Sequence, residues 1–123
     1  MKEVFTLETE EMASCAHALR YLPKDHKCGR THGHNVVLKV KILADILDEK
    51  GMVMDFGEIK KVVDELDHTD LNLIFTQPTS ELVAQAVART IADKMGKRWL
   101  KIEVKAEETP KHCAKVTLYR ESP

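Results

Sequence analysis

The feature that most constrains the fold is a regular alternation of side chains that begins at a pair of histidines. Apolar residues recur at every second position over residues 35–42, namely Val36, Leu38, Val40 and Ile42. Side chains two residues apart on a strand point to the same face, so this pattern predicts a strand with one buried face. His32 and His34 continue the same parity. We therefore expect both imidazoles on the buried face, where the strand begins.

A second strand is predicted over residues 2–16, and His17 ends it. The segment 19–31 contains a proline and a glycine, so we expect it to be a loop between the two strands. The resulting hairpin would bring His17 beside His32 and His34. A His-x-His pair alone is more often hydrogen-bonded than metal-bound. Three converging imidazoles with one open position are typical of a catalytic zinc site.

The rest of the chain predicts two helices followed by two strands, over residues 55–66, 79–95, 99–108 and 113–120. Asp55 is expected to cap the first helix, either Thr79 or Ser80 the second, and Gly96 is expected to end the second helix. The order β-β-α-α-β-β predicts one α+β domain over residues 1–123, with an antiparallel sheet and both helices on one face. The opposite face should be exposed to solvent, because it carries Lys39, Lys41, Lys101, Glu103 and Lys105.

The composition argues against several classes of protein. The 123 residues include 19 basic and 20 acidic side chains, so there is no basic excess to indicate nucleic-acid binding. No apolar run is long enough to cross a bilayer, and the N-terminus lacks an apolar signal segment. We therefore expect a cytoplasmic protein that does not associate with membranes and whose three cysteines stay reduced.

Parity also selects a carboxylate near the end of the third predicted strand. Glu108 should face inward with Ala106, whereas Glu107 should face the solvent. An inward carboxylate needs a partner, because an unpaired buried charge is costly. That partner is either a backbone N–H group or a lysine, or else a ligand ring with two adjacent N–H donors.

The polar link between the two predicted helices contains adjacent acidic and imidazole groups, Asp67 and His68. Such a pair is usually solvated. A histidine is also the side chain whose charge changes near neutral pH, and Asp67 or Asp70 could orient it for proton transfer.

Cys28 is open to three interpretations. It can be a buried thiol of the core. It can be a proton acceptor, because Lys24, Lys27, Arg30 and a nearby zinc ion would favour its thiolate form. Finally, Cys28 or Cys15 can be a fourth zinc ligand, which would make a closed structural site.

These stretches together resemble the 6-pyruvoyltetrahydropterin synthase family over nearly the whole chain. In chain order, the matching stretches are residues 16–19, 28–34, 51–56, 66–72, 78–81 and 108–109. Each stretch is weak alone, and their shared order makes the resemblance specific. The three residues between Cys28 and His32 are most similar to the prokaryotic branch of the family that forms 6-carboxy-5,6,7,8-tetrahydropterin.

The resemblance implies a role for each candidate residue. Cys28 would be the proton acceptor, and Asp67 and His68 would form its relay. Glu108 would hold the pterin ring. The Zn²⁺ ion would be held by His17, His32 and His34.

The resemblance further implies the tunnelling fold, in which subunits close their sheets into a barrel. The chain would then form a homo-oligomer, with a hexamer favoured and a tetramer as the alternative. The sites would lie where subunits meet, so that His68 acts on a neighbour's zinc site. The implied substrate is 7,8-dihydroneopterin triphosphate, and the implied products are 6-carboxy-5,6,7,8-tetrahydropterin, acetaldehyde and triphosphate, in queuosine and deazapurine biosynthesis.

Two alternatives stay open at this point. The first is a related enzyme of the same fold that forms 6-pyruvoyltetrahydropterin or cleaves a sepiapterin-like substrate. The second is a zinc-stabilised module that binds a pterin without catalysis.

Overall fold

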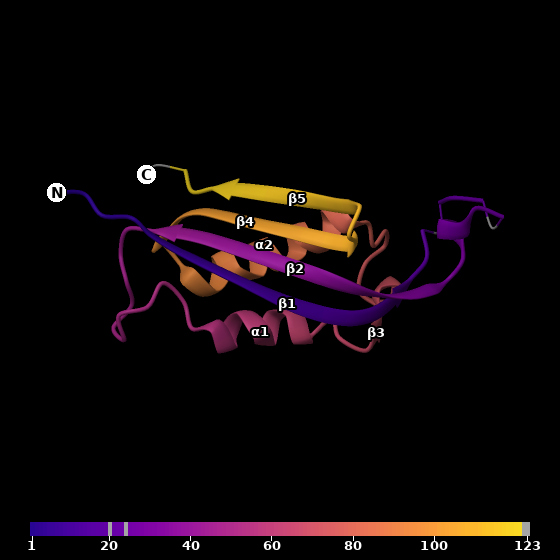
Figure 1. Cartoon of the computed structure of the whole chain (residues 1–123), viewed down its shortest axis with the longest axis horizontal. Helices are drawn as coiled ribbons and strands as arrows, with labels where there is room; N and C mark the ends of the chain where they lie inside the picture. The colour runs from indigo at the N-terminus through magenta and orange to yellow at the C-terminus, as the bar shows by residue number, and fades with distance from the viewer. Residues whose placement is uncertain (20, 24, 122–123) are drawn as a thin grey trace.

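A computed structural model of the chain describes residues 1–19, 21–23 and 25–121, which form one sheet with two helices on one of its faces (Figure 1). The helices and strands, in chain order, are β1 Phe5–His17, β2 His32–Ala44, α1 Phe56–Asp64, β3 Thr69–Asp70, α2 Ser80–Met95, β4 Trp99–Thr109 and β5 His112–Tyr119. Two short 3-10 turns, η1 Lys27–Gly29 and η2 Leu71–Leu73, complete the described elements. The predicted α+β class is confirmed.

The strands are ordered β3-β1-β2-β4-β5 across the sheet. The pairs β1–β2, β2–β4 and β4–β5 are antiparallel. β1 and β2 form a long hairpin in which Phe5 lies opposite Ala44 and His17 lies opposite His32. Figure 1 shows that the hairpin extends beyond β4 and β5 at the end of the sheet away from the chain termini. The loop of the hairpin, and the ends of β1 and β2 that adjoin it, therefore lie beyond the ends of β4 and β5.

The edge strand β3 differs from the prediction, which made residues 67–72 a polar connection. β3 has only two residues and pairs in parallel with β1, so that Cys15 lies opposite Thr69 and Ala16 lies opposite Asp70. Two residues are too few to show a period in the sequence. The backbone groups at the edge of β1 need partners nonetheless, and this link supplies them. The sheet is therefore mixed rather than wholly antiparallel.

The helices begin and end at the predicted signals. The Asp55 carboxylate accepts a hydrogen bond from Gly57 N–H at the start of α1, and the Thr79 hydroxyl accepts one from Leu82 N–H at the start of α2. Gly96 ends α2 with a φ of 63°, a conformation that glycine adopts without the strain of a Cβ atom. Among the described residues, no helix combines the length and apolar character needed to cross a bilayer.

The core lies between the sheet and the two helices. Its largest fully buried side chains include Leu38 and Ile42 of β2, Ile59 of α1, Leu71 of η2, Ile91 of α2 and Ile102 of β4. Full burial of each such side chain stabilises the fold by about 1.5–3 kcal/mol relative to exposure. The inward face predicted from the alternation of 35–42 and 99–108 is therefore confirmed.

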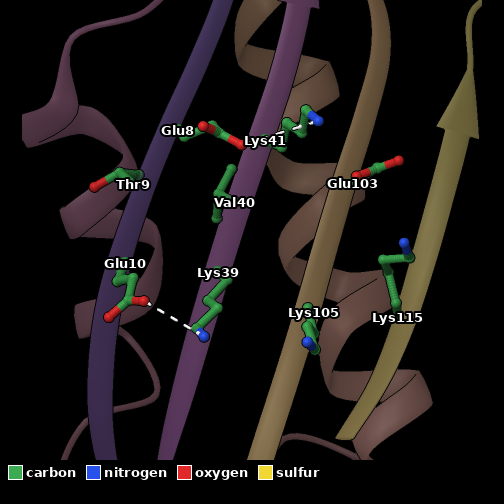
Figure 2. A pocket seen from close by; sticks show the side chains of 9 residues that line it. All are labelled: Glu8, Thr9, Glu10, Lys39, Val40, Lys41, Glu103, Lys105 and Lys115. Atoms are coloured by element: carbon green, nitrogen blue, oxygen red, sulfur yellow. Dashed lines mark ion pairs between the residues drawn. The ribbon is translucent and has the colours of Figure 1, made fainter.

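The opposite face of the sheet is polar, as predicted. Figure 2 shows side chains of this face that belong to β1, β2, β4 and β5. They line a pocket with a volume of about 580 Å³. Lys39 lies at the centre of this face, with its Nζ atom 3.5 Å from Glu10 and 3.3 Å from Glu107. Exposed pairs of this kind add little to the stability of the fold, because both partners stay solvated.

Candidate metal and ligand site

Three histidines meet at the loop end of the β1–β2 hairpin. His17 ends β1 opposite His32, which begins β2, and His34 lies opposite Cys15. Because the three share the inward parity, their rings are direct or diagonal cross-strand neighbours. The ring centroid of His17 lies 4.6 Å from that of His32 and 4.3 Å from that of His34, and the last two are 5.4 Å apart. The structure thus brings together the three rings that the sequence pattern grouped.

These rings have the chemistry of a metal site. One nitrogen from each ring lies within 4.8 Å of the others, and no other such group of histidines, cysteines or carboxylates occurs in residues 1–19, 21–23 and 25–121. His17 Nδ1 and His34 Nε2 are buried, and neither has a hydrogen-bond partner in this part of the chain. Buried polar atoms are rarely left without a partner, and a bound cation would satisfy both. The residues present therefore fit zinc.

The protonation of the rings suits the same role. Burial lowers the pKa of His17, and the neighbouring His34 imidazole lowers it further. Burial also lowers the pKa of His34, although the Glu108 carboxylate acts in the opposite direction. His32 is oriented by a hydrogen bond of 2.8 Å from its Nδ1 to the Arg30 carbonyl, which leaves Nε2 free to bind a cation. Neutral imidazoles with free lone pairs are the form that binds a metal.

Glu108 faces these rings from the end of β4. Its Oε1 atom lies 4.0 Å from His17 Nε2, and the hydroxyl of Ser80 donates a 2.7 Å hydrogen bond to the same oxygen. Glu107 lies on the opposite face, 3.3 Å from Lys39. The predicted parity of the two glutamates therefore holds. Among the described residues the hydrogen-bond partner of Glu108 is the Ser80 hydroxyl, so the first of the two expected partners, a backbone N–H group or a lysine, is not found. The carboxylate keeps capacity for the donors of a ligand ring, which was the second expectation.

Asp67 and His68 are joined to each other and to the edge of β1. Asp67 Oδ2 lies 2.9 Å from His68 Nδ1, and Asp67 Oδ1 accepts a 2.7 Å hydrogen bond from Ser14 N–H. The Ser14 bond and then His68 hold the pKa of Asp67 below its usual range. His68 is 84% exposed and has a φ of 58°. Asp67, rather than Asp70, therefore orients the imidazole, which points away from the body of this chain.

The two cysteines near the site have different surroundings. Cys28 lies in η1 within the projecting loop and is half-buried. Cys15 is buried, and that burial raises the pKa of its thiol to about 11. Neither sulfur belongs to the converging group of the described residues, so nothing in the structure favours a closed site with a sulfur ligand. Of the basic residues near Cys28, Lys27 and Arg30 are exposed and Lys24 lies outside the described residues.

Two side chains of the site were not predicted. The amide of Asn72 accepts a 2.7 Å hydrogen bond from Ala18 N–H and donates a 2.9 Å bond to the Ala18 carbonyl, one residue after His17. Either Thr79 or Ser80 was expected to cap α2; Thr79 is the cap, and the unpredicted role of Ser80 is to hold Glu108. The only indication in the sequence that Asn72 and Ser80 belong to the site was that they lie in the stretches 66–72 and 78–81. Nothing in the neighbouring residues indicated which groups they would bond.

Comparison with known proteins gives a consistent result. Residues 6–118 match the model of a protein family described as 6-pyruvoyl tetrahydropterin synthase. A relative from Archaeoglobus fulgidus, provisionally named as a 6-carboxy-5,6,7,8-tetrahydropterin synthase, is 37% identical over 98 residues, which cover 76% of this chain and 82% of that protein. The 6-carboxy-5,6,7,8-tetrahydropterin synthase of Bacillus subtilis is 30% identical over 120 residues, which cover 86% of this chain and 80% of that protein.

A solved structure supports the same grouping. The structure of 6-pyruvoyl tetrahydropterin synthase from Caenorhabditis elegans superposes with a TM-score of 0.70 at 30% sequence identity. The superposition covers 98% of each chain. The similarity therefore extends over the whole described fold and includes both strands of the histidine hairpin.

Proposed function

The chain belongs to the 6-pyruvoyl tetrahydropterin synthase family, and on this premise we propose that it converts 7,8-dihydroneopterin triphosphate into 6-carboxy-5,6,7,8-tetrahydropterin in a zinc-dependent reaction. The reaction takes up water and releases acetaldehyde and triphosphate. The name of the Bacillus subtilis relative supports this product. The product would enter the biosynthesis of queuosine and related deazapurines.

One observation carries the proposal: a carboxylate and three imidazoles share a small space. Glu108 Oε1 lies 4.0 Å from His17 Nε2, and the nitrogens of His17, His32 and His34 lie within 4.8 Å of one another. A pterin ring has adjacent N–H donors, which a single carboxylate can accept together. A ring held by Glu108 would lie beside the histidine cluster. Zinc bound there would act as a Lewis acid that polarises the side-chain hydroxyls.

The protons would be handled by residues of the chain itself. Cys28, as the thiolate, would remove a proton from the substrate side chain. His68 would supply or accept a proton, and Asp67 would hold it in the required orientation through the 2.9 Å contact with Nδ1. Glu108 would fix the ring throughout, so that the reacting carbons stay beside the base.

The exposure of His68 supports an assembly of several copies. Its side chain is 84% exposed in the single chain, although the proposed role requires a site closed to water. We infer a homo-oligomer whose sites lie between subunits, with a hexamer favoured over a tetramer, so that His68 serves the histidine cluster of a neighbour. The solved relative from Caenorhabditis elegans gives the fold for such an assembly but not the subunit number.

The test is incubation of the zinc-loaded protein with 7,8-dihydroneopterin triphosphate, followed by mass analysis of the pterin, acetaldehyde and triphosphate. The expected pterin is the 6-carboxy compound, in equal amount with acetaldehyde. Glu108→Gln should lose turnover at low substrate concentration. Glu107→Gln is the matched control, because it removes the neighbouring charge from the opposite face of β4.

Other products would select the alternatives. A 6-pyruvoyl product without acetaldehyde would indicate the activity named for the Caenorhabditis elegans protein, which is the second candidate function. Cleavage of sepiapterin alone would indicate the related lyase activity. Stoichiometric zinc with tight pterin binding and no product from either substrate would leave only a binding module.

A further inference from the structure

The segment 67–72 lies along the end of β1 and is joined to it through Asp67, His68, the two residues of β3 and Asn72. We propose that Asn72, at the far end of this segment, is a positioning residue that fixes the metal-ligating direction of His17. The inference rests on the proposed function in one respect, namely that the histidine cluster binds a metal. It adds a residue that neither touches the metal nor contacts the substrate.

The bonds run in register along the strand. Asp67 Oδ1 accepts from Ser14 N–H at 2.7 Å, and His68 N–H donates to the Ser14 carbonyl at 2.5 Å. The two residues of β3 then pair with the next two residues of β1. The Asn72 amide completes the series by bonding both backbone groups of Ala18, at 2.7 and 2.9 Å. His17 therefore lies between Ala16, which pairs with Asp70, and Ala18, which is bonded to Asn72.

An amide is the group that this contact requires. Asn72 uses its oxygen as an acceptor and its nitrogen as a donor, so it satisfies an N–H group and a carbonyl of one residue at the same time. An aspartate would keep the acceptor but would place a second oxygen against the Ala18 carbonyl. The amide is itself held, because Asp70 Oδ1 accepts a 3.0 Å hydrogen bond from Asn72 N–H. The preceding residue, Leu71, is buried at 1% exposure.

We call the two hydrogen bonds between Asn72 and Ala18 the clamp. They act just beyond His17 and His32, the last residue pair of β1 and β2. Ala18 is 1% exposed and directly follows His17, which is 3% exposed. His17 is the last residue of β1, and just beyond it the backbone is held by the Asn72 bonds to Ala18 and by the bond from Leu19 N–H to the Cys28 carbonyl. Without the two bonds to Asn72, the backbone at Ala18 could rotate and carry the His17 ring away from His34, whose centroid is 4.3 Å distant.

The same clamp reaches the loop that carries Cys28. Leu19 N–H, one residue beyond Ala18, donates a 2.7 Å hydrogen bond to the Cys28 carbonyl. Asn72 thus holds the first residue of a short backbone path that leads from the histidine cluster to the proposed base. Loss of the two Asn72 bonds should therefore disturb both the position of His17 and the position of Cys28.

The test is the affinity for Co²⁺ and Zn²⁺, measured by competition with a chelating dye, in the parent protein and in Asn72→Asp and Asn72→Ala. Residues that orient a ligand typically change metal affinity by about 10–100-fold when replaced, so we expect a loss in this range for Asn72→Ala. Thr69→Val is the matched control. It removes a comparable 2.6 Å bond within the same segment, from the Thr69 hydroxyl to the Leu66 carbonyl, and it leaves the backbone pairing of Thr69 with β1 in place.

Metal affinity is measured well below the melting temperature of each variant, so that global unfolding does not contribute. A general structural effect would lower the affinity equally in Thr69→Val, whereas a positioning effect would be confined to the Asn72 variants. Asn72→Asp, which has nearly the same shape, keeps the test usable if Asn72→Ala fails to fold. Affinities within twofold of the parent in both Asn72 variants would overturn the inference, and so would an equal loss in Thr69→Val or a parent that binds no metal. A parent that binds metal without turnover rejects the proposed function and leaves this inference standing.

Discussion

Glu108 and His17 face each other across the end of the sheet, with 4.0 Å between Oε1 of the carboxylate and Nε2 of the imidazole. They come from strands that are not neighbours, since β2 lies between β1 and β4. A hydroxyl at the start of α2, that of Ser80, holds the carboxylate in this orientation. The contact joins the two parts of the proposed site, the group that would hold the ring and the group that would hold the metal.

Replacement of Glu108 by glutamine should weaken substrate binding. Hydrogen bonds to a charged group contribute about 1.5–3 kcal/mol, so KM should rise about 10–100-fold. Glu107→Gln is the control, and its KM should change less than about threefold, because Glu107 pairs with Lys39 on the outer face. Steady-state kinetics with the triphosphate substrate measures both. Equal effects in the two variants would show that the inward face of β4 does not bind the ring.

The contact between Glu108 and His17 shows how much of the site could be predicted from the sequence. Strand parity alone placed Glu108 inward and Glu107 outward, and the hairpin alone placed His17 beside His32 and His34. Both predictions depend on a period of two, which is a local property of the backbone. The register shift near Glu108 was not predicted, because such a shift leaves no mark in the alternation before it.

Replacement of one histidine of the cluster should abolish stoichiometric zinc binding. His32→Ala removes a ring whose Nδ1 is held by the Arg30 carbonyl, and two imidazoles bind zinc much more weakly than three. We expect about one zinc per chain in the parent and well under a tenth of that in the variant. His112→Ala, an exposed histidine of β5, is the control. Metal content after dialysis measures the result, and retention of zinc by His32→Ala would remove that residue from the ligand set.

Removal of the metal from the parent should abolish turnover reversibly. A chelator would take zinc from the cluster, while the core between the sheet and the helices remains folded, because the hydrophobic side chains that form it do not include the three histidines. Activity should return when zinc is added back, and circular dichroism should change little throughout. Full turnover by a preparation shown to be free of metal would contradict the zinc-dependent reaction.

Asp67 should stabilise the folded chain at neutral pH, and this contribution should be lost in acid. The Ser14 N–H bond and the His68 imidazole hold its pKa below the ordinary value of 3.8. A carboxyl with a lowered folded-state pKa stabilises the fold above pH 3.8, and that contribution is lost as the pH falls through the folded value. The parent should therefore melt at a higher temperature than Asp67→Asn at neutral pH, and the difference should shrink below pH 3.8. Asp93→Asn, on α2, controls for the loss of one charge, and a difference that grows on acidification would contradict the assignment.

The parts that the sequence did not reveal are those set by contacts between distant segments. Asn72 bonds Ala18 across a separation of 54 residues, and Ser80 bonds Glu108 across 28. Each contact depends on how an irregular link packs against the end of a strand. Propensity and period carry no information about such packing, because both describe a residue and its near neighbours. A polar link between two helices was predicted correctly, but its pairing with the edge of β1 was not.

Replacement of Cys28 by alanine should separate chemistry from metal binding. Cys28 lies in η1, outside the group of ring nitrogens that converge, so the variant should keep zinc and its fold. Loss of a positioned base typically lowers the rate about 10²–10⁴-fold, and we expect kcat to fall in that range with little change in KM. Cys113→Ala, an exposed thiol on β5, is the matched control and should retain full activity. If Cys28→Ala loses zinc in parallel with turnover, the sulfur is a metal ligand and the proton acceptor must be sought elsewhere.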